Sequence, residues 1–213
     1  MNAEINLNEL FGREIYNTII KYNLRQNLEI GSWDGEGSTN CFVEAMKQLS
    51  GDLSLFCVDV VKDKIEDLAN RYKQVVFVKP IHASSITYNQ LKYKNFKELW
   101  NSEYNKIPRD LYSEELVETW FNRDVESLKQ ANTSALDYLK NKTWDSVLID
   151  GGEFTGYSEY LLIKDKTKVI FLDDVHKAFK CNQIYWELQN NNEWQLIFDL
   201  PHARNGAAAF IRK

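Results

Sequence analysis

The strongest constraint on the fold of this chain is an alternation of short apolar runs with helical stretches. The first two apolar runs, 27–30 and 53–58, are followed by helical patterns at 39–49 and 62–72. Apolar strands that are separated by helices are typical of a parallel sheet covered on both faces. The sequence therefore predicts an α/β fold. The runs are rich in Val and Ile, and they are 27–30, 53–58, 75–78, 145–149 and 168–172.

The last part of the chain has a different pattern. Two further apolar runs, 194–199 and 207–211, flank a turn that contains Asn205 and Gly206. An Asn-Gly pair between two such runs favours an antiparallel hairpin. We therefore expect a Rossmann-like sheet of seven strands, mostly parallel with the last strand antiparallel, and helices on both faces. Without internal repeats or a linker, residues 1–213 are predicted to form a single domain.

Composition excludes several classes of function. The chain of 213 residues is 44% hydrophobic and carries a net charge of −5, without a Lys/Arg block that would follow a nucleic acid. No apolar run approaches the ~20 residues that span a bilayer, and the first residues do not resemble a signal peptide. Three scattered cysteines, Cys41, Cys57 and Cys181, indicate core residues rather than disulfides or a zinc site. These observations predict a cytoplasmic protein without a nucleic-acid or membrane partner.

One connection is too long for a simple crossover. A crossover between parallel strands needs about a dozen residues, but the third and fourth runs are separated by 88–143, which is rich in aromatic residues. Within it, Val117, Phe121, Val125 and Leu128 recur at helical spacing after Ser113, a plausible N-cap. We predict a helical insertion at about 93–132. It is either a layer packed on the core or across a homo-oligomer interface, or a lid over a ligand site, and the two roles are compatible.

The stretch LEIGSWDGEGST, 28–39, predicts a strand, a tight glycine turn and a helix that together cradle a ligand. A phosphate-binding P-loop requires a Lys after the glycines, and none is present. A dinucleotide-binding turn requires a third glycine, and counting from Gly35 and Gly37 that position is Asn40. Both of these ligand classes are therefore disfavoured.

The pattern Glu29-x-Gly31-x-x-x-Gly35 resembles motif I of class I S-adenosylmethionine-dependent methyltransferases. The resemblance implies that the glycine turn passes under the methionine part of the cofactor. It also implies that Glu29 orders the turn or meets the amino group, that Asp59 binds the ribose hydroxyls, and that Ser84 or Ser85 contacts adenine. A bidentate carboxylate suits a diol. The cofactor residues predicted in this way are Glu29, Gly31, Ser32, Trp33, Gly35, Ser38, Asp59, Ser84 and Asp150.

Acidic residues also follow the fourth and fifth runs, with Asp150 after one and Asp173 and Asp174 after the other. Neighbouring parallel strands lie about 4.8 Å apart and ligands bind beyond their carboxyl ends, so these three carboxylates should converge beside the cofactor. Unpaired, they would repel one another. An all-oxygen cluster selects Mg²⁺, Mn²⁺ or Ca²⁺. The alternative is that Asp150 forms a turn and that Asp173 and Asp174 cap the next helix.

This arrangement resembles the metal-dependent O-methyltransferases of the catechol and macrocin types, in which such residues hold Mg²⁺ against the acceptor hydroxyls. The element IDGGEF is similar to the DGxH element of the sugar-modifying branch, but Glu153 stands where His is usual. Three roles stay open there: Glu153 is the base, Glu153 is a fourth metal ligand, or His176 supplies the base. Arg204 and Asn205, in the last hairpin, are expected to reach the acceptor from the rim.

Together, these patterns predict an S-adenosylmethionine-dependent O-methyltransferase assisted by Mg²⁺ or Mn²⁺. Its expected acceptor is a small polyhydroxylated molecule, a sugar or sugar nucleotide. Asp150, Glu153 and His176 are the predicted catalytic residues, because a carboxylate or imidazole must take the hydroxyl proton. The alternatives are a metal-independent methyltransferase of the same fold and a non-catalytic binding subunit that keeps the cofactor pocket.

Overall fold

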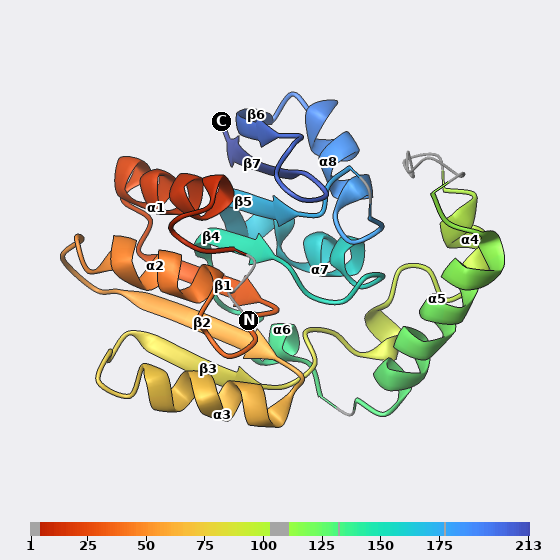
Figure 1. The fold of residues 1–213 in the computed structure, drawn as a ribbon, viewed down its shortest axis with the longest axis horizontal. Helices are drawn as coiled ribbons and strands as arrows, with labels where there is room; N and C mark the ends of the chain where they lie inside the picture. Colours follow the sequence, from red (N-terminus) through yellow and green to blue (C-terminus); the bar gives the residue numbers. More distant parts are fainter. Residues whose placement is uncertain (1–4, 103–110, 132, 177) are drawn as a thin grey trace.

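The computed structural model describes residues 5–102, 111–131, 133–176 and 178–213, and Figure 1 shows their arrangement. Its centre is one seven-stranded sheet in the order β3-β2-β1-β4-β5-β7-β6. All neighbours from β3 to β5 pair in parallel, whereas β7 is antiparallel to both β5 and β6. The predicted fold class is thus confirmed. The strands are β1 Gln26–Ile30, β2 Ser54–Asp59, β3 Val78–His82, β4 Trp144–Ile149, β5 Thr167–Asp173, β6 Trp194–Leu200 and β7 Ala207–Arg212.

Helices cover both faces of the sheet (Figure 1). Alternate residues of each buried strand point to opposite faces, so that Leu148 packs into one core while Val147 and Ile149 pack into the other. The first core lies under α1 Leu10–Tyr22, α2 Ser38–Met46 and α3 Lys62–Arg71. The second lies under α6 Ala135–Tyr138, α7 Gly156–Ile163 and α8 Asn182–Gln189, with the short 3₁₀ helix η2 Lys164–Lys166 after α7.

The third strand lies later in the chain than predicted. Residues 75–78 form a turn in which the Val78 N–H donates to the Val75 carbonyl, and Val76 is almost fully exposed. The strand itself runs from Val78 to His82 and includes Pro80 opposite Cys57. Proline has no backbone N–H to donate to a neighbouring strand, but β3 is an edge strand and has a neighbouring strand on one side only. The Lys79-Pro80 pair was therefore wrongly taken as the end of the strand.

The insertion between β3 and β4 is helical, as predicted. It contains the 3₁₀ helix η1 Tyr88–Gln90, then α4 Phe96–Trp100 and α5 Glu114–Lys129, while 103–110 and 132 lie outside the described residues. Ser113 caps α5 by accepting the N–H of Leu116 at 3.3 Å. One face of α5 is buried in the second core through Val117, Phe121, Val125 and Leu128. These helices are thus a layer on the core, and their closing over a ligand stays a prediction.

Two further expectations concern the described part of the chain. Its cysteines, Cys41, Cys57 and Cys181, are free and buried, as the sequence indicated. None of its helices combines the length and the apolar character that crossing a bilayer requires. The cytoplasmic location stays a prediction from composition.

Candidate active site

The glycine turn after β1 is held between the two neighbouring strands. The N–H groups of Gly31 and Ser32 donate to the Val58 carbonyl of β2, at 2.9 and 3.3 Å, and the Asp150 N–H donates to the Ile30 carbonyl. Gly31 has φ +88°, and a Cβ at this position would lie 2.1 Å from the Asp150 carbonyl oxygen. Only glycine therefore allows the turn to pass this close to the end of β4.

Glu29 orders the start of α2. Its two carboxylate oxygens accept the hydroxyls of Ser38 at 2.5 Å and Thr39 at 2.6 Å, and its side chain is fully buried. Burial raises the pKa of Glu29 to about 7, although the two hydroxyl hydrogen bonds oppose that shift. Of the two roles expected for Glu29, these contacts provide the ordering of the turn.

Asp59, at the end of β2, connects the turn to the loop that follows. One carboxylate oxygen accepts the N–H of Trp33 and the other that of Val61, both at 2.9 Å. Each oxygen keeps lone pairs for a ligand, because a carboxylate has about four acceptor sites. Asp59 therefore supports the turn and retains the capacity to bind a diol.

A cavity of about 370 Å³ opens where the carboxyl ends of β1, β2 and β4 meet. This is the position where ligands bind in open α/β sheets. The buried hydroxyl of Ser32 makes no hydrogen bond to the described residues, and Ser32 is not part of the cavity wall. The cavity is lined by Ile30, Gly31, Trp33, Val58, Asp59, Val60, Val61, Ala83, Ser85, Asp150, Gly151 and Gly152.

The other predicted cofactor residues lie around this cavity in different ways. Trp33 lines it, is about half exposed, and has the Lys64 ammonium 5.1 Å from its ring centre. Gly35 packs against Leu68 and Tyr72, and its carbonyl accepts the Tyr72 hydroxyl. Ser84 turns its hydroxyl to the Ile86 carbonyl at 2.6 Å. Its neighbour Ser85 lines the cavity and donates to the buried Glu159.

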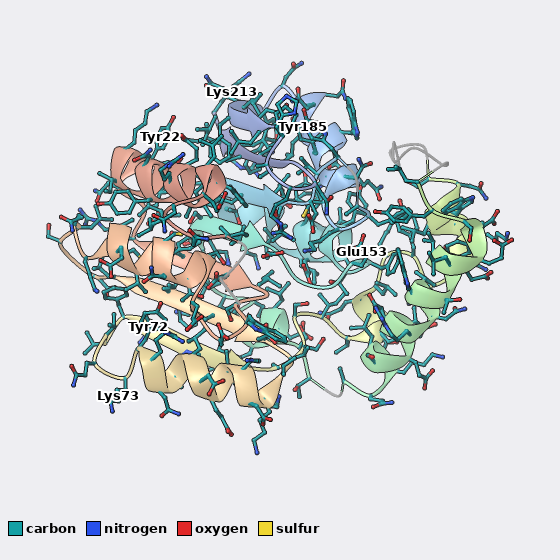
Figure 2. All side chains as sticks on the ribbon, viewed as in Figure 1. Tyr22, Tyr72, Lys73, Glu153, Tyr185 and Lys213 are labelled. Atoms are coloured by element: carbon teal, nitrogen blue, oxygen red, sulfur yellow. The ribbon has the colours of Figure 1, made fainter. Side chains whose placement is uncertain are left out.

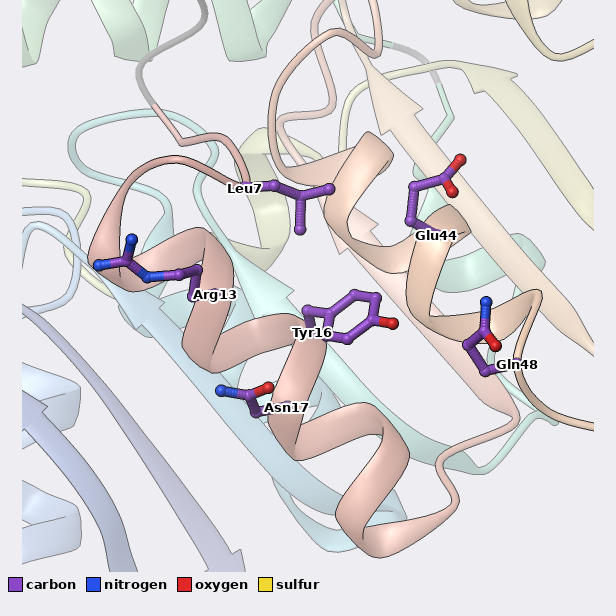
Figure 3. A pocket seen from close by; sticks show the side chains of 6 residues that line it. All are labelled: Leu7, Arg13, Tyr16, Asn17, Glu44 and Gln48. Atoms are coloured by element: carbon purple, nitrogen blue, oxygen red, sulfur yellow. The ribbon is translucent and has the colours of Figure 1, made fainter.

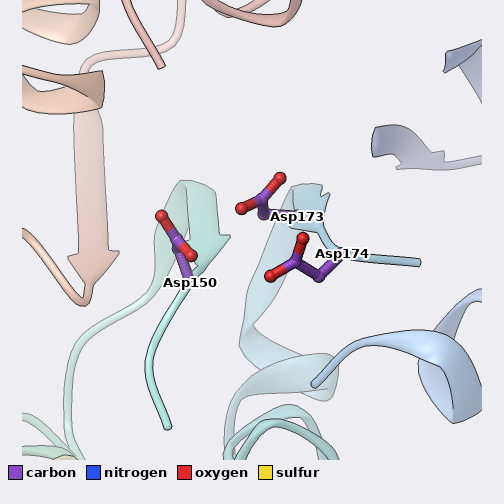
Figure 4. A group of neighbouring side chains, drawn as sticks. All are labelled: Asp150, Asp173 and Asp174. Carbon is purple, nitrogen blue, oxygen red and sulfur yellow. The ribbon is translucent and has the colours of Figure 1, made fainter. Parts of the chain in front are cut away.

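The three aspartates come together as predicted. Figure 4 shows Asp150 after β4 and Asp173 and Asp174 at the end of β5, with their carboxylates turned toward a common space. One oxygen from each lies within 4.8 Å of the others. Asp173 and Asp174 are buried, and Asp150 is partly buried. We call these three residues the Asp trio.

Two basic side chains that lie 30 and 31 positions from their partners along the chain offset part of the negative charge of the Asp trio. The Lys180 ammonium is 2.7 Å from an Asp150 oxygen and 2.9 Å from an Asp174 oxygen. The Arg204 guanidinium is 3.0 Å from Asp173, and the Asn205 amide donates to Asp174 at 3.0 Å. Arg204 and Asn205 were predicted for this site. Lys180 was not, because the sequence analysis assigned the charge conflict to a metal ion.

Burial and mutual repulsion dominate the electrostatics of this cluster. Burial raises the pKa of Asp173 to about 8, with Asp150 and Asp174 adding to the shift and Lys180 and Arg204 opposing it. Burial also raises the pKa of Asp150, against the effect of the Lys180 ammonium. For Lys180, burial alone would lower the pKa, but the three carboxylates outweigh it and raise the pKa above its usual value.

The two other predicted bases are engaged elsewhere. A Glu153 carboxylate oxygen accepts the Phe179 N–H at 2.6 Å, and burial raises the pKa of Glu153. Figure 2 labels Glu153 between the carboxyl end of the sheet and the inserted helices. The His176 Nε2 lies 3.3 Å from Asp199, which also accepts the Tyr185 hydroxyl at 2.8 Å. In the described contacts, Glu153 joins the loop after β4 to the loop after β5, and His176 joins the loop after β5 to strand β6.

A second cavity, of about 410 Å³, borders the Asp trio on another side. Asp173 and Arg204 are part of its wall, whereas Asp150 is part of the wall of the first cavity. The trio therefore stands between two cavities. The lining residues of the second cavity are Ile5, Glu9, Leu10, Phe11, Asp173, Asp199, Leu200, Pro201, His202, Ala203 and Arg204.

A third cavity, of about 440 Å³, lies on α1 and α2 (Figure 3). None of the predicted site residues lines it. Figure 3 shows Leu7 before α1 and Gln48 just after α2, with the other four side chains on the two helices. It is lined by Leu7, Arg13, Tyr16, Asn17, Glu44 and Gln48. We therefore place the candidate site at the first two cavities.

Known proteins resemble this chain in structure rather than in sequence. No protein-family model matches it, and no curated protein is significantly similar in sequence. A candidate caffeoyl-CoA O-methyltransferase from Staphylococcus aureus superposes with a TM-score of 0.59 at 13% identity, over 96% of this chain and 84% of the other.

Two further solved structures contain a cofactor or its product. One is an O-methyltransferase from Bacillus cereus in complex with SAH, with a TM-score of 0.56, 10% identity, and coverage of 95% of this chain and 80% of the other. The second is TomG from Streptomyces achromogenes, an O-methyltransferase of tomaymycin synthesis in complex with SAM. It has a TM-score of 0.54 at 12% identity and covers 95% and 79% of the two chains. This chain therefore has the fold of the class I S-adenosylmethionine-dependent methyltransferases.

Proposed function

We propose that this chain transfers a methyl group from S-adenosylmethionine to a hydroxyl of a small acceptor. The observation that carries the proposal is the Asp trio between two cavities, one of which lies at the glycine turn and Asp59. SAM and SAH occupy TomG and the Bacillus cereus enzyme, which share this fold. Bound in the first cavity, S-adenosylmethionine would supply an electrophilic methyl group on a sulfonium.

Two residues of the first cavity, Asp59 and Gly31, suit different parts of that cofactor. Asp59 has the lone pairs to accept both ribose hydroxyls, and charge-assisted hydrogen bonds of this kind are the stronger ones. Gly31 keeps the floor free of side chains where the backbone approaches Asp150. Orientation of the reacting atoms in this way provides a large part of the rate in a two-substrate reaction.

We place the acceptor in the second cavity. Its volume is within the usual range for small-molecule sites, about 300–1,000 Å³. Its wall combines carboxylates and a guanidinium with apolar residues such as Phe11 and Leu200. This mixture suits a polyhydroxylated molecule, which has polar edges and apolar ring faces, and the sugar or sugar nucleotide expected from the sequence has this chemistry.

Asp150 is the best-placed proton acceptor. It lines the first cavity, where we place the cofactor. One of its carboxylate oxygens is also within 4.8 Å of an oxygen of Asp173, which lines the second cavity, where we place the acceptor. During transfer, the acceptor oxygen would bond to the methyl carbon as the carbon–sulfur bond breaks, and the hydroxyl proton would pass to Asp150. Burial raises the pKa of Asp150 and makes it a better base than an exposed aspartate. Glu153 and His176 stay predictions as alternative bases.

The divalent cation predicted from the sequence fits the Asp trio in donor type but not in arrangement. Three carboxylate oxygens suit Mg²⁺ or Mn²⁺. However, the Lys180 ammonium lies within 3 Å of two of the three carboxylates and would have to leave for a metal to bind. We therefore assign no step of the reaction to a metal ion.

Binding of S-adenosylhomocysteine tests the proposal before the acceptor is known. A ligand that binds only the folded chain raises its melting temperature, so S-adenosylhomocysteine should raise it and NAD⁺ should not. Asp59→Ala should weaken binding about 100-fold by calorimetry, because two charge-assisted hydrogen bonds are lost. Asp52→Ala, an exposed aspartate before the same strand, is the matched control and should bind normally. A shift with NAD⁺ and none with S-adenosylhomocysteine would refute the methyltransferase function.

A further inference from the structure

Lys180 occupies the space that the Asp trio encloses. Its ammonium nitrogen is 2.7 Å from Asp150, 2.9 Å from Asp174 and 4.0 Å from Asp173. The first two distances are those of charge-assisted N–H to carboxylate contacts. Only 12% of its side chain is exposed, so water replaces few of these interactions. Among the described cations, Lys180 is the one within 4 Å of all three carboxylates.

The charges of the cluster leave little need for a metal ion. Among the residues that the structure describes, the three carboxylates face two side-chain cations, Lys180 and Arg204, which leaves one formal negative charge. A divalent ion bound to the same oxygens would lie within a few ångströms of the ammonium, and like charges at that distance repel strongly in a buried site. The carboxylates can therefore hold the ammonium or a divalent cation, but not both in the same place.

The backbone next to Lys180 is anchored by contacts of the preceding residue. The preceding residue, Phe179, donates its N–H to Glu153 at 2.6 Å. Its ring lies 5.6 Å from that of Phe154 and 6.2 Å from that of Trp100 in the inserted α4. A shift of the backbone at Lys180 would thus disturb a partly buried hydrogen bond and an aromatic cluster.

We propose that Lys180 is the resident cation of the Asp trio and takes the position of the divalent metal, so that this chain works without one. The proposal rests on the proposed function for its catalytic meaning. An ammonium has three N–H donors, and the two close carboxylates leave one for an acceptor oxygen. In that position it would orient the hydroxyl and stabilise the negative charge that develops on the oxygen as the proton leaves.

Metal binding by the intact chain tests this without any substrate. Mn²⁺ binding is followed by electron paramagnetic resonance and calorimetry, and the melting temperature is measured in EDTA and in excess Mn²⁺. For the wild type we expect no binding tighter than millimolar and equal melting temperatures. For Lys180→Ala, which leaves three carboxylates without the ammonium, we expect a lower melting temperature in EDTA, recovery with Mn²⁺, and Mn²⁺ binding at least about tenfold tighter.

Three variants separate this effect from a general loss of structure. Lys180→Arg keeps the charge and should gain no Mn²⁺ binding, and Lys168→Ala, which removes an exposed lysine of β5, should behave like the wild type. Adding Asp174→Asn to Lys180→Ala should abolish the gained binding. If Lys180→Ala does not fold in EDTA, Lys180→Gln replaces it, because glutamine keeps the length and removes the charge.

Two results would overturn the proposal. One is Mn²⁺ binding by the wild type tighter than millimolar, together with a melting temperature that falls in EDTA. The other is a folded Lys180→Ala or Lys180→Gln variant that gains no Mn²⁺ binding. Failure of the proposed function is seen separately, because S-adenosylhomocysteine binding by the wild type does not enter either result.

Discussion

The two halves of the candidate site are built by contacts of different range. Around the glycine turn, Glu29 bonds to residues 9 and 10 positions later, and Asp59 bonds to the N–H of Val61, two positions later, and to that of Trp33, 26 positions earlier. Around the Asp trio, Asp150 is paired with a residue 30 positions away, and Asp173 and Asp174 with residues 31 positions away. The cofactor half is thus built mainly from consecutive elements of the chain, β1, α2 and β2, whereas the trio half exists only after the loops beyond β4, β5 and β6 have assembled.

Replacement of Gly31 tests the point where the two halves touch. Gly31→Ala puts a Cβ 2.1 Å from the Asp150 carbonyl oxygen at φ +88°. We expect the free energy of unfolding to fall by about 4 kcal/mol or more, because backbone strain and a backbone collision add. Gly51→Ala is the matched control at φ +105°, where the Cβ meets only the end of the Arg25 side chain. It should lose about 1–2 kcal/mol. Equal losses in urea unfolding would contradict a contact between the halves.

Replacement of Phe154 tests whether the trio half alone depends on the insertion. Phe154 is buried, with the ring of Phe121 from α5 at 5.5 Å and that of Phe179 at 5.6 Å. Phe154→Ala should lower the free energy of unfolding by about 3–4 kcal/mol, as is usual for a buried aromatic ring. S-adenosylhomocysteine affinity of the folded variant should stay nearly unchanged.

The control for this change is Tyr138→Ala, which removes an exposed aromatic ring of α6. It should change the stability by less than about 0.5 kcal/mol. A large loss of S-adenosylhomocysteine affinity in Phe154→Ala would show that the insertion also supports the cofactor half.

Replacement of Glu29 gives the smallest effect and tests the cofactor half alone. Because burial raises the pKa of Glu29 to about 7 from an ordinary 4.5, the folded chain binds more protons than the unfolded chain between these values. The contribution of Glu29 to stability is therefore full below pH 4.5 and is lost as the pH rises through 7. The slope is at most about 1.4 kcal/mol per pH unit.

Glu29→Gln should remove this slope from urea unfolding measured across that pH range. Glu66→Gln, at an exposed site on α3, should leave the slope as it is in the wild type. A slope that persists in Glu29→Gln would show that another buried group is responsible.

The parts of the site that the sequence predicted are those that follow from the strands, because a buried apolar run and the acidic residue after it can be recognised along the chain. Strands β1, β2, β4 and β5 were found at their buried runs, and three of their ends carry Asp59, Asp150 and Asp173 as expected. Strand β3 was misplaced because Pro80 ends a central strand but not an edge strand, and edge position is a property of the whole sheet. The orientation of His176 toward Asp199 likewise depends on how β6 packs.

The α/β layering, the glycine turn and the convergence of three carboxylates can be predicted without the structure. These follow from steric rules and from the geometry of parallel strands, which act over a few residues or repeat along the chain. The identity of the cation that faces those carboxylates, in contrast, depends on how the loops pack in the folded chain. An aspartate cluster is neutralised by whatever positive charge comes within a few ångströms, and the position of Lys180 is set by loop packing that no local pattern encodes.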